Sequence, residues 1–398
     1  MDRIVVVGAS LAGLRAVEAL RRKGFAGSIT LIGDEKRTPY DRPPLSKEVL
    51  RGEWEAERVD LRRKGYDDLN LDLRLGKRAT KLDTAARFVE LEGGERVAYD
   101  GLLLTCGTVP RKLPNQPDLP GVFMLRTLDD ALAMRDALTR KPRVAVIGAG
   151  FIGSEVAASC VKLGLPVTVI EALPVPLSRS LGPKLGEVLA ELHRKNGVDL
   201  RLGAAVAAIE GAGKVERVVL GDGSVIPCDV LCVGIGVAPS VDWLEGSGLA
   251  LDNGVVCDEY CETNVKGVYA AGDVANWMNP LFGERMRVEH WTNAVEQAKV
   301  AAENLLAGDG PRQAFASAPM FWSDQYGIKI QGAGRPKATD TIHLCHGTPA
   351  DGSFTALYGR EGRLVGVVTF QQPAKLFQYR KMIVEKASWE AALEAAAK

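Results

Sequence analysis

Two glycine-rich turns, each following a hydrophobic strand and preceding a helical stretch, constrain the fold of this chain more than any other feature. The first turn spans residues 8–13 after a strand at 4–7, and the second spans 148–153 after a strand at 144–147. Glycines let a pyrophosphate approach the backbone, and the following helix offers it free N–H groups and a partial positive charge. We therefore expect two dinucleotide sites.

The residues after each turn support that expectation. Each turn leads into an amphipathic helix, a second strand and an acidic residue about 20 positions on, the distance typical of a carboxylate that binds an adenosine ribose. Asp34 follows Gly13 by 21 residues, and Glu171 follows Gly153 by 18. A tight turn also needs glycine for conformational reasons alone, and this leaves a purely structural role open for one of the two turns.

Length and composition set broader limits. A chain of 398 residues exceeds what one hydrophobic core usually supports, so two or three domains are expected. Fifty basic residues balance fifty acidic ones, so the whole chain has no electrostatic attraction to nucleic acid or membrane. The absence of a leader-like start or a membrane-length apolar run favours a cytoplasmic location. Seven cysteines without CxxC spacing predict neither a disulfide scaffold nor a metal site.

The order of the segments predicts an α/β fold with one Rossmann-like unit inserted in another. We assign residues 1–109 and 241–315 to a discontinuous first nucleotide-binding domain, 110–240 to the second, and 316–398 to a C-terminal α+β domain. A strand ending in Gly272 and Asp273 returns the chain to the first domain. Helices are expected at 127–140, 293–306 and 374–385, and strands at 354–358 and 364–369.

The last domain is the basic one. Residues 325–386 contain nine Lys and Arg against four Asp and Glu, whereas residues 241–315 contain five against twelve. Such an excess indicates either a solvated face or a surface that attracts an acidic partner.

Several runs together resemble the oxygenase-coupled ferredoxin reductases, flavoproteins of the putidaredoxin reductase type within the pyridine nucleotide-disulphide oxidoreductase superfamily. The resemblance covers the whole chain. The most specific runs are residues 39–47, 105–107, 270–273, 289–291 and 321–327.

The resemblance implies that the first unit binds FAD. Gly8, Ser10 and Gly13 would surround its pyrophosphate, Asp34 or Glu35 would bind its ribose, and Arg42 would neutralise phosphate. Asp273 would accept from the ribityl chain, and His290 and Trp291 would bring backbone N–H groups to the flavin. Ser10 replaces a glycine common in such turns, which makes close backbone approach less certain. The other FAD residues implied are Leu11, Ala12, Lys47, Ala79, Thr105, Gly107, Arg111, Gly272, Glu289 and Trp322.

The second unit would bind NADH. Glu171 would take the ribose and reject the 2′-phosphate of NADPH, with Arg179 near enough in sequence to weaken that preference. The remaining NADH residues implied are Gly148, Gly150, Phe151, Ile152, Gly153, Glu155, Gly234 and Gly236.

Three of these residues are expected to act catalytically. Lys47 would stabilise the negative charge that arrives on the flavin with hydride, Glu155 would lie beside the nicotinamide and could pair with Lys47, and Trp322 would shield the flavin edge. Each has a simpler explanation: a surface lysine at a helix start, a carboxylate that a helix N-terminus favours, and a core tryptophan.

The function implied is transfer of electrons from NADH through FAD to a [2Fe-2S] ferredoxin that serves a Rieske dioxygenase or a haem monooxygenase. Residues 41–47 lack the CxxxxC pair of flavoprotein disulfide reductases, so no dithiol takes part, and Cys106 is expected to be a buried small hydrophobe. The alternatives are a redox-controlled flavoprotein like apoptosis-inducing factor, and a reductase of rubredoxin or oxygen. Arg335, Lys337, Arg380 and Lys381 are candidate ferredoxin contacts.

Overall fold

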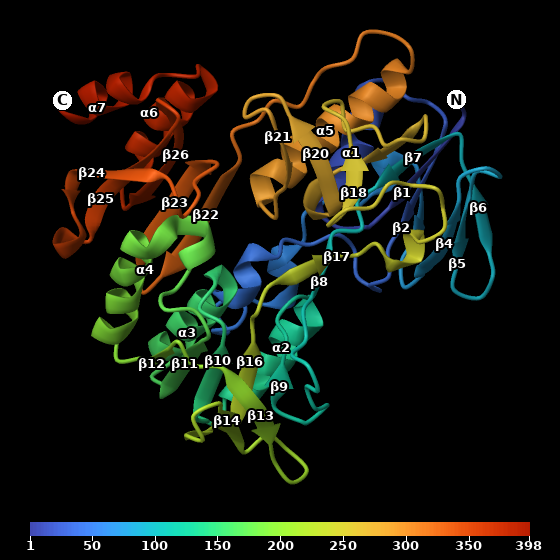
Figure 1. Cartoon of the computed structure of the whole chain (residues 1–398). Helices are drawn as coiled ribbons and strands as arrows, with labels where there is room; N and C mark the ends of the chain where they lie inside the picture. Colours follow the sequence, from blue (N-terminus) through green and yellow to red (C-terminus); the bar gives the residue numbers. More distant parts are fainter. The chain divides into compact units, whose positions relative to one another are not determined.

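The computed structural model describes all 398 residues, and the chain divides into two compact units (Figure 1). One consists of Met1–Asp41, Asp60–Val109 and Ala238–Phe321, and the other of Arg42–Val59, Pro110–Val237 and Trp322–Lys398. We call them unit 1 and unit 2. The chain leaves and re-enters each unit, as expected when one nucleotide-binding unit is inserted in another. The exact boundaries predicted above stay predictions.

Unit 1 is built on a parallel sheet with β1 (Arg3–Val7) at its centre. Helix α1 (Leu11–Arg22) joins β1 to β2 (Ser28–Ile32), and its apolar face is buried. The strand order is β19–β7–β1–β2–β3, where β3 is Leu71–Arg74, β7 is Gly101–Leu104 and β19 is Val268–Ala270. Strands β2 and β7 lie on opposite sides of β1, so the direction of strand order reverses at β1. Doubly wound sheets bind ligands at such a switch point.

Unit 2 repeats this arrangement around β10 (Val144–Ile147). Helix α3 (Phe151–Lys162) joins β10 to β11 (Val167–Glu171), and α4 (Ser178–Lys195), kinked at Gly182, joins β11 to β12 (Asp199–Leu202). The order is β12–β11–β10–β16–β9, with β16 at Val230–Val233 and β9 at Val122–Phe123. Four strands of each parallel sheet therefore share one topology, whereas the fifth comes last along the chain in unit 1 (β19) and first in unit 2 (β9).

Further helices and three small sheets of three strands each accompany the two parallel sheets. Unit 1 adds β4 (Ala79–Asp83), β5 (Phe88–Leu91), β6 (Arg96–Ala98), β18 (Val255–Cys257), β20 (Ala275–Asn279), β21 (Glu284–Arg287) and α5 (Trp291–Ala307). Unit 2 adds α2 (Leu128–Leu138), β13 (Val206–Glu210), β14 (Arg217–Leu220) and β15 (Val225–Pro227). The chain passes between the units along β8 (Thr108–Pro110), β17 (Val237–Pro239) and β22 (Met320–Gln325).

The C-terminal region forms a five-stranded sheet with two helices, drawn in orange and red in Figure 1. Its order is β22–β23–β26–β25–β24, with β23 at Ile328–Gly334, β24 at Thr341–Thr348, β25 at Ser353–Arg360 and β26 at Arg363–Phe370. The helices are α6 (Pro373–Val384) and α7 (Trp389–Ala396). This confirms the predicted α+β region, and the five expected helices and strands lie within two residues of the observed ones. No helix combines the length and apolarity needed to cross a membrane.

Candidate functional site

The first glycine-rich turn is packed so tightly that its two outer glycines cannot be replaced. Gly8 has φ +118° and donates its N–H to the Ile32 carbonyl at 2.8 Å. A Cβ added to Gly8 would lie 2.2 Å from the Thr105 carbonyl oxygen, and one added to Gly13 would lie 2.1 Å from the Gly8 oxygen. These glycines hold β1, α1 and the residue after β7 together, whether or not a ligand binds.

The turn that contains Gly272 and Asp273 reaches the same place. Gly272 lies in a short 3-10 helix, η5 (Gly272–Val274), and a Cβ on it would be 3.1 Å from that of Ala12 and 3.7 Å from that of Ala294. Asp273 follows, and its Oδ2 accepts a hydrogen bond from the Thr108 hydroxyl at 3.4 Å. The first turns of α1 and α5 and this Gly-Asp turn therefore meet.

The residues before α5 are fixed by polar contacts within unit 1. His290 is the N-cap residue, and the Trp291 indole donates to Asp41 Oδ1 at 2.8 Å. Glu289 pairs with Arg287 at 2.8 Å. The structure thus brings predicted FAD residues of unit 1 together around the carboxyl end of β1. Four others, Arg42, Lys47, Arg111 and Trp322, belong to unit 2.

Two polar residues near this turn were missed by the sequence analysis. Gln297 Oε1 accepts from the Gly272 N–H at 2.9 Å and from Asn293 Nδ2 at 3.3 Å, and both side chains are buried on α5. Asn293 Oδ1 and Gln297 Nε2 have no hydrogen-bond partner. Buried polar atoms usually have partners, so these fit a polar ligand at this turn. An Asn and a Gln four apart on an apolar helix face were the available signal.

The contacts of Asp34 and Glu35 do not show which of the two carboxylates would bind the ribose in unit 1. Asp34 is exposed and lies 3.9 Å from Arg78, whereas Glu35 Oε2 accepts from the Tyr40 hydroxyl at 2.5 Å. Of the other FAD residues predicted in unit 1, Leu11 begins α1, Ala79 begins β4, and Gly107 has φ +67°.

The second glycine-rich turn closes in the same way as the first. A Cβ on Gly148 would lie 2.3 Å from the Gly234 oxygen, and one on Gly153 would lie 2.0 Å from the Gly148 oxygen. Glu171, at the end of β11, accepts from the N–H groups of Ala149 at 2.7 Å and Leu173 at 2.9 Å. The carboxylate is therefore held against the turn, at the place where a ribose hydroxyl is expected.

Gly150 differs from its neighbours because neither packing nor conformation requires it. Its φ is −75°, which any residue adopts, and an added Cβ would meet no atom within 4 Å. No side chain caps the N-terminus of α3 or of α1, where Ser10 takes the place of Gly150. Open space in front of uncapped helix N–H groups fits a pyrophosphate.

Glu155, on α3, lies at the centre of a buried polar cluster. Its Oε2 accepts from Lys47 Nζ at 2.7 Å and from the Ser46 hydroxyl at 2.5 Å, and its Oε1 accepts from the Ser323 hydroxyl at 2.8 Å. Lys47 follows the 3-10 helix η1 (Pro43–Ser46) and is only 6 % exposed. Lys47 is therefore not a surface lysine, and the pair with Glu155 that the resemblance suggested is present.

Behind Ser323 the cluster continues to Gln325, whose Nε2 donates to the Ser323 hydroxyl oxygen at 3.1 Å. Both side chains are buried and lie two residues apart on β22, hence on one face of the strand. Trp322 is half-buried and alternates to the other face. Sequence analysis quoted this run but did not single out Ser323 or Gln325.

A second buried contact ties the same strand end to α3. His193 on α4 is fully buried, with Nδ1 2.6 Å from the Tyr326 hydroxyl and Nε2 3.2 Å from the Ser154 hydroxyl. Burial lowers the pKa of His193 to about 4, so the imidazole is neutral near pH 7. Sequence analysis gave no role to this histidine.

The remaining predicted residues of unit 2 lie on several different elements. Arg42 donates to the Arg126 carbonyl, while Arg111 binds the backbone of Gly236 and Val237. The others are Phe151 and Ile152, which begin α3, and Arg179, which is exposed at the start of α4.

Cys106 lies after β7 in unit 1 and is partly buried rather than fully buried as expected, and its thiol contacts the Ser240 carbonyl oxygen at 3.2 Å. Burial raises the pKa of Cys106 to about 12, so its sulfur stays protonated.

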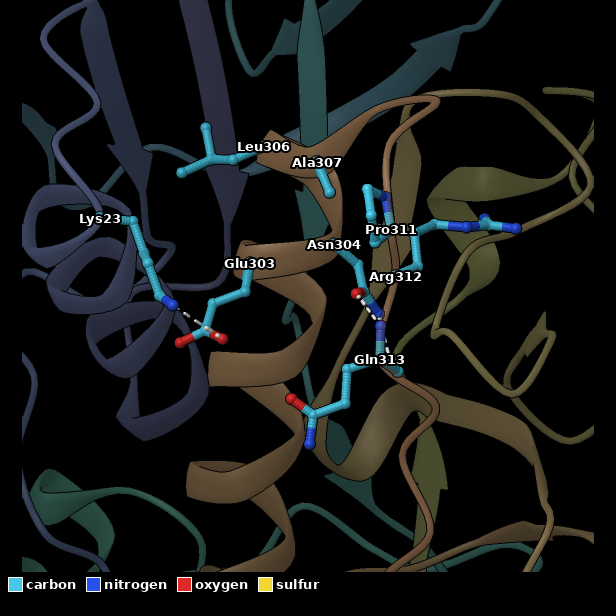
Figure 2. Close-up of a pocket in the computed structure, with 8 residues that line it drawn as sticks. All are labelled: Lys23, Glu303, Asn304, Leu306, Ala307, Pro311, Arg312 and Gln313. Atoms are coloured by element: carbon cyan, nitrogen blue, oxygen red, sulfur yellow. Dashed lines mark hydrogen bonds and ion pairs between the residues drawn. The ribbon is translucent and has the colours of Figure 1, made fainter.

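A pocket of about 530 Å³ in unit 1 lies elsewhere (Figure 2). It is lined by residues from the C-terminal ends of α1 and α5, including Lys23 and Glu303, whereas the glycine-rich turn meets the N-terminal ends of these helices. Most of its polar side chains already have partners: Lys23 pairs with Glu303, Arg312 pairs with Glu262, and Asn304 binds the backbone of Tyr260 and Gln313. We assign it no catalytic role.

Comparison with known proteins decides the family. Residues 2–298 match the model of pyridine nucleotide-disulphide oxidoreductases, which is well over half of the chain. The chain belongs to the pyridine nucleotide-disulphide oxidoreductase family. Residues 320–398 match the C-terminal region of the reductases in this family, in agreement with the separate C-terminal sheet.

Several named reductases resemble the chain along nearly its whole length. Rhodocoxin reductase of Rhodococcus erythropolis is 39% identical over 383 residues, covering 96% of this chain and 89% of the relative. The ferredoxin–NAD(+) reductase component of the anthranilate 1,2-dioxygenase system of Burkholderia cepacia is 38% identical, covering 96% and 94%. The reductase in the covalent putidaredoxin reductase–putidaredoxin complex has a TM-score of 0.92 at 35% identity, covering 97% and 93%.

Proposed function

We propose that this oxidoreductase is an NADH:ferredoxin reductase that passes electrons from NADH through FAD to the ferredoxin of an oxygenase system. The presence of two parallel sheets that share the topology of four strands, each with a glycine-rich turn, carries the proposal, because one chain then holds two dinucleotides. The relatives named above are reductases of this kind. The cysteine-free run at 41–47 means that no dithiol takes part, so the flavin reacts with its acceptor directly.

FAD is assigned to unit 1 and NADH to unit 2. The uncapped N-termini of α1 and α3 bind the two pyrophosphates, with room spared by Gly150 and a hydroxyl offered by Ser10. FAD held by these residues would supply acceptance of a hydride and release of single electrons. The chain's own contribution is to bind the two dinucleotides, to orient them and to exclude water.

Lys47 and Glu155 form the polar core of the catalytic machinery in this proposal. An ammonium group in a poorly hydrated place stabilises negative charge far more strongly than it would in water. Glu155 fixes the Lys47 ammonium by an ion pair at 2.7 Å, with only 8 % of the lysine side chain and 4 % of the glutamate side chain exposed. Such a buried pair is costly unless further hydrogen bonds satisfy it, and the two serine hydroxyls supply them.

A [2Fe-2S] ferredoxin docks on the basic C-terminal region in this proposal. Arg335 and Lys337 follow β23, and Arg380 and Lys381 lie on α6. The two α6 residues line a hollow of about 230 Å³ together with Phe377, whose side chain is largely exposed. Val384 and Glu385 also line this hollow, so its two basic residues lie beside two apolar side chains and one carboxylate. The excess of positive charge attracts an acidic partner from a distance.

Titration of the purified protein with NADH tests the proposal. We expect flavin absorbance to bleach under anaerobic conditions and to return on addition of an oxidised [2Fe-2S] ferredoxin, with reduction of cytochrome c through the ferredoxin in steady state. Oxygen consumption faster than ferredoxin-dependent cytochrome reduction would instead indicate an NADH oxidase. A preparation that binds no FAD would end the proposal.

A further inference from the structure

The buried carboxylate of Glu155 has a donor on each of its oxygens, and the donors come from two separate stretches of unit 2. Lys47 and Ser46 serve Oε2, and Ser323 of the C-terminal region serves Oε1 at 2.8 Å. An ionised carboxylate only accepts hydrogen bonds, so the proton in the Ser323 contact belongs to the serine. The hydrogen bond from Ser323 therefore fixes the orientation of Oε1, the second oxygen of the Glu155 carboxylate.

Gln325 fixes the direction of that hydrogen bond. Since the Ser323 proton points at Glu155, the serine oxygen must accept from Gln325, and the amide N–H₂ group must face it at 3.1 Å. The amide oxygen of Gln325 is buried without a partner. Burying an unpaired amide oxygen costs free energy, and a methionine of similar length would not bury one. The amide of Gln325 therefore contributes through its N–H donor to Ser323.

The turn after β22 also contacts α3 through His193, at Ser154, the residue before Glu155. Tyr326 contacts His193, and His193 contacts Ser154, which precedes Glu155 on α3. The pKa of His193 is lowered to about 4, so this link is uncharged near pH 7 and adds no field that would compete with Lys47. Residues at the end of β22 thus bind the Glu155 carboxylate directly through Ser323. They also contact helix α3 through His193 and Ser154.

We propose that Ser323, oriented by Gln325, is a positioning residue for hydride transfer from NADH, acting through Glu155 and Lys47. This inference depends on the proposed function. It gives the C-terminal region a role in the reductive half-reaction in addition to the ferredoxin docking proposed above. A carboxylate without its Ser323 donor is free to rotate about its terminal bond and to shift the Lys47 ammonium that it holds.

The experiment compares S323A with S323T, Q325M and the control S317A, using the FAD-loaded proteins. Ser317 is matched because it is also buried and donates to a glutamate, Glu296, at 2.9 Å, but in unit 1. Anaerobic stopped-flow reduction by NADH gives the limiting rate constant and the apparent Kd for NADH. Hydrogen–deuterium exchange of the 151–160 peptide of α3, recorded without NADH, gives a readout that is independent of turnover.

We expect S323A to lower the limiting rate constant at least fivefold with the apparent Kd changed less than twofold, and to raise exchange in the α3 peptide at least threefold. S323T should recover to within threefold of the wild type, and S317A should match the wild type. If S323A loses its flavin, Q325M carries the test, with an expected two- to threefold lower rate constant at unchanged Tm.

Reduction of S323A within twofold of the wild type, equal slowing in S317A, equal slowing in S323T, or unchanged exchange of the α3 peptide would each overturn the inference. A wild-type protein that NADH does not reduce would overturn the proposed function instead. The wild-type measurement therefore separates the two failures.

Discussion

Gly33 and Glu171 occupy equivalent positions at the ends of matching strands, yet only one carries a side chain. The Gly8 N–H binds the Ile32 carbonyl in unit 1, and the Gly148 N–H binds the Ile170 carbonyl in unit 2, each at 2.8 Å. The next residue is Gly33 in one sheet and Glu171 in the other. A Cβ on Gly33 would lie 2.6 Å from that of Ala9, so the acid of unit 1 falls one or two residues later, at Asp34 or Glu35.

The position of Glu171 predicts a strong preference for NADH over NADPH. A 2′-phosphate about 4 Å from this carboxylate would cost about 4 kcal/mol at an effective dielectric near 20, or about three decades in affinity. We expect E171Q to lower the ratio of kcat/KM for NADH to that for NADPH by about two decades, because the neutral amide removes the repulsion. The exposed α4 variant E191Q should leave the ratio unchanged, and comparable Michaelis constants in the wild type would contradict the prediction.

The empty space in front of Gly150 predicts that G150A separates binding from stability. Alanine adopts φ −75° without strain and its methyl group meets nothing within 4 Å, so Tm should hold or rise slightly. A bound pyrophosphate would meet that methyl group, and we expect the Kd for NAD⁺, measured by calorimetry, to rise about tenfold, or about 1.4 kcal/mol. In the control G221A the methyl would make only a 3.6 Å contact with Ala205. Unchanged affinity in G150A would remove the turn from the binding site.

Burial of His193 predicts acid sensitivity with a definite sign. Its pKa is about 4 in the folded protein against 6.5 for the free group, so the unfolded chain binds the proton more tightly between these values. Stability is therefore complete above pH 6.5 and is lost as the pH falls toward 4, by about 3 kcal/mol in total. The wild type should lose more Tm than H193Q between pH 7 and pH 5. Substitution of the exposed His343 in H343Q should leave the change of Tm with pH as in the wild type. Equal changes of Tm with pH in all three proteins would refute the role of His193 in acid sensitivity.

The protonated thiol of the partly buried Cys106 predicts that this residue takes no part in electron transfer. Its pKa of about 12 leaves almost no thiolate at pH 8. We expect C106A to keep both NADH-dependent flavin reduction and ferredoxin-linked turnover within twofold of the wild type. Iodoacetamide at pH 8 should leave Cys106 unmodified in the folded protein, as peptide mass analysis would show. Loss of turnover in C106A with full flavin content would mean that the thiol contributes after all.

The sequence predicted the elements and the topology well because both nucleotide-binding units depend on local signals. Glycines in a strand-to-helix turn and a carboxylate at the end of the next strand are visible in one dimension. The Lys47–Glu155 pair was anticipated only through family resemblance, since 108 residues separate the partners.

The contacts around Glu155 could not be read from local pattern. Ser323 and Gln325 lie at alternate positions of a strand, which indicates a shared face but not what lies opposite. His193 is one polar residue on an amphipathic helix, and only the fold reveals that Tyr326 and Ser154 enclose it. Long-range pairing of short polar side chains depends on packing that the sequence does not encode locally.

Charge reversal on α6 tests the ferredoxin surface. Lys381 is exposed and forms an i,i+4 pair with Glu385 at 3.7 Å, which contributes little to stability. We expect K381E to lower the second-order rate constant for ferredoxin reduction several-fold at low ionic strength and to flatten its dependence on salt, because steering by charge is lost. Flavin reduction by NADH should not change.

The matched control for this variant is K195E on α4. Lys195 is similarly exposed and also forms an i,i+4 pair, with Glu191 at 4.0 Å, but it lies outside the C-terminal region. It changes the net charge of the protein by the same amount, so any effect of total charge appears equally in both variants. A rate constant lowered in K381E alone places the ferredoxin on α6, whereas equal rate constants and equal salt slopes in the two variants would place the docking surface elsewhere.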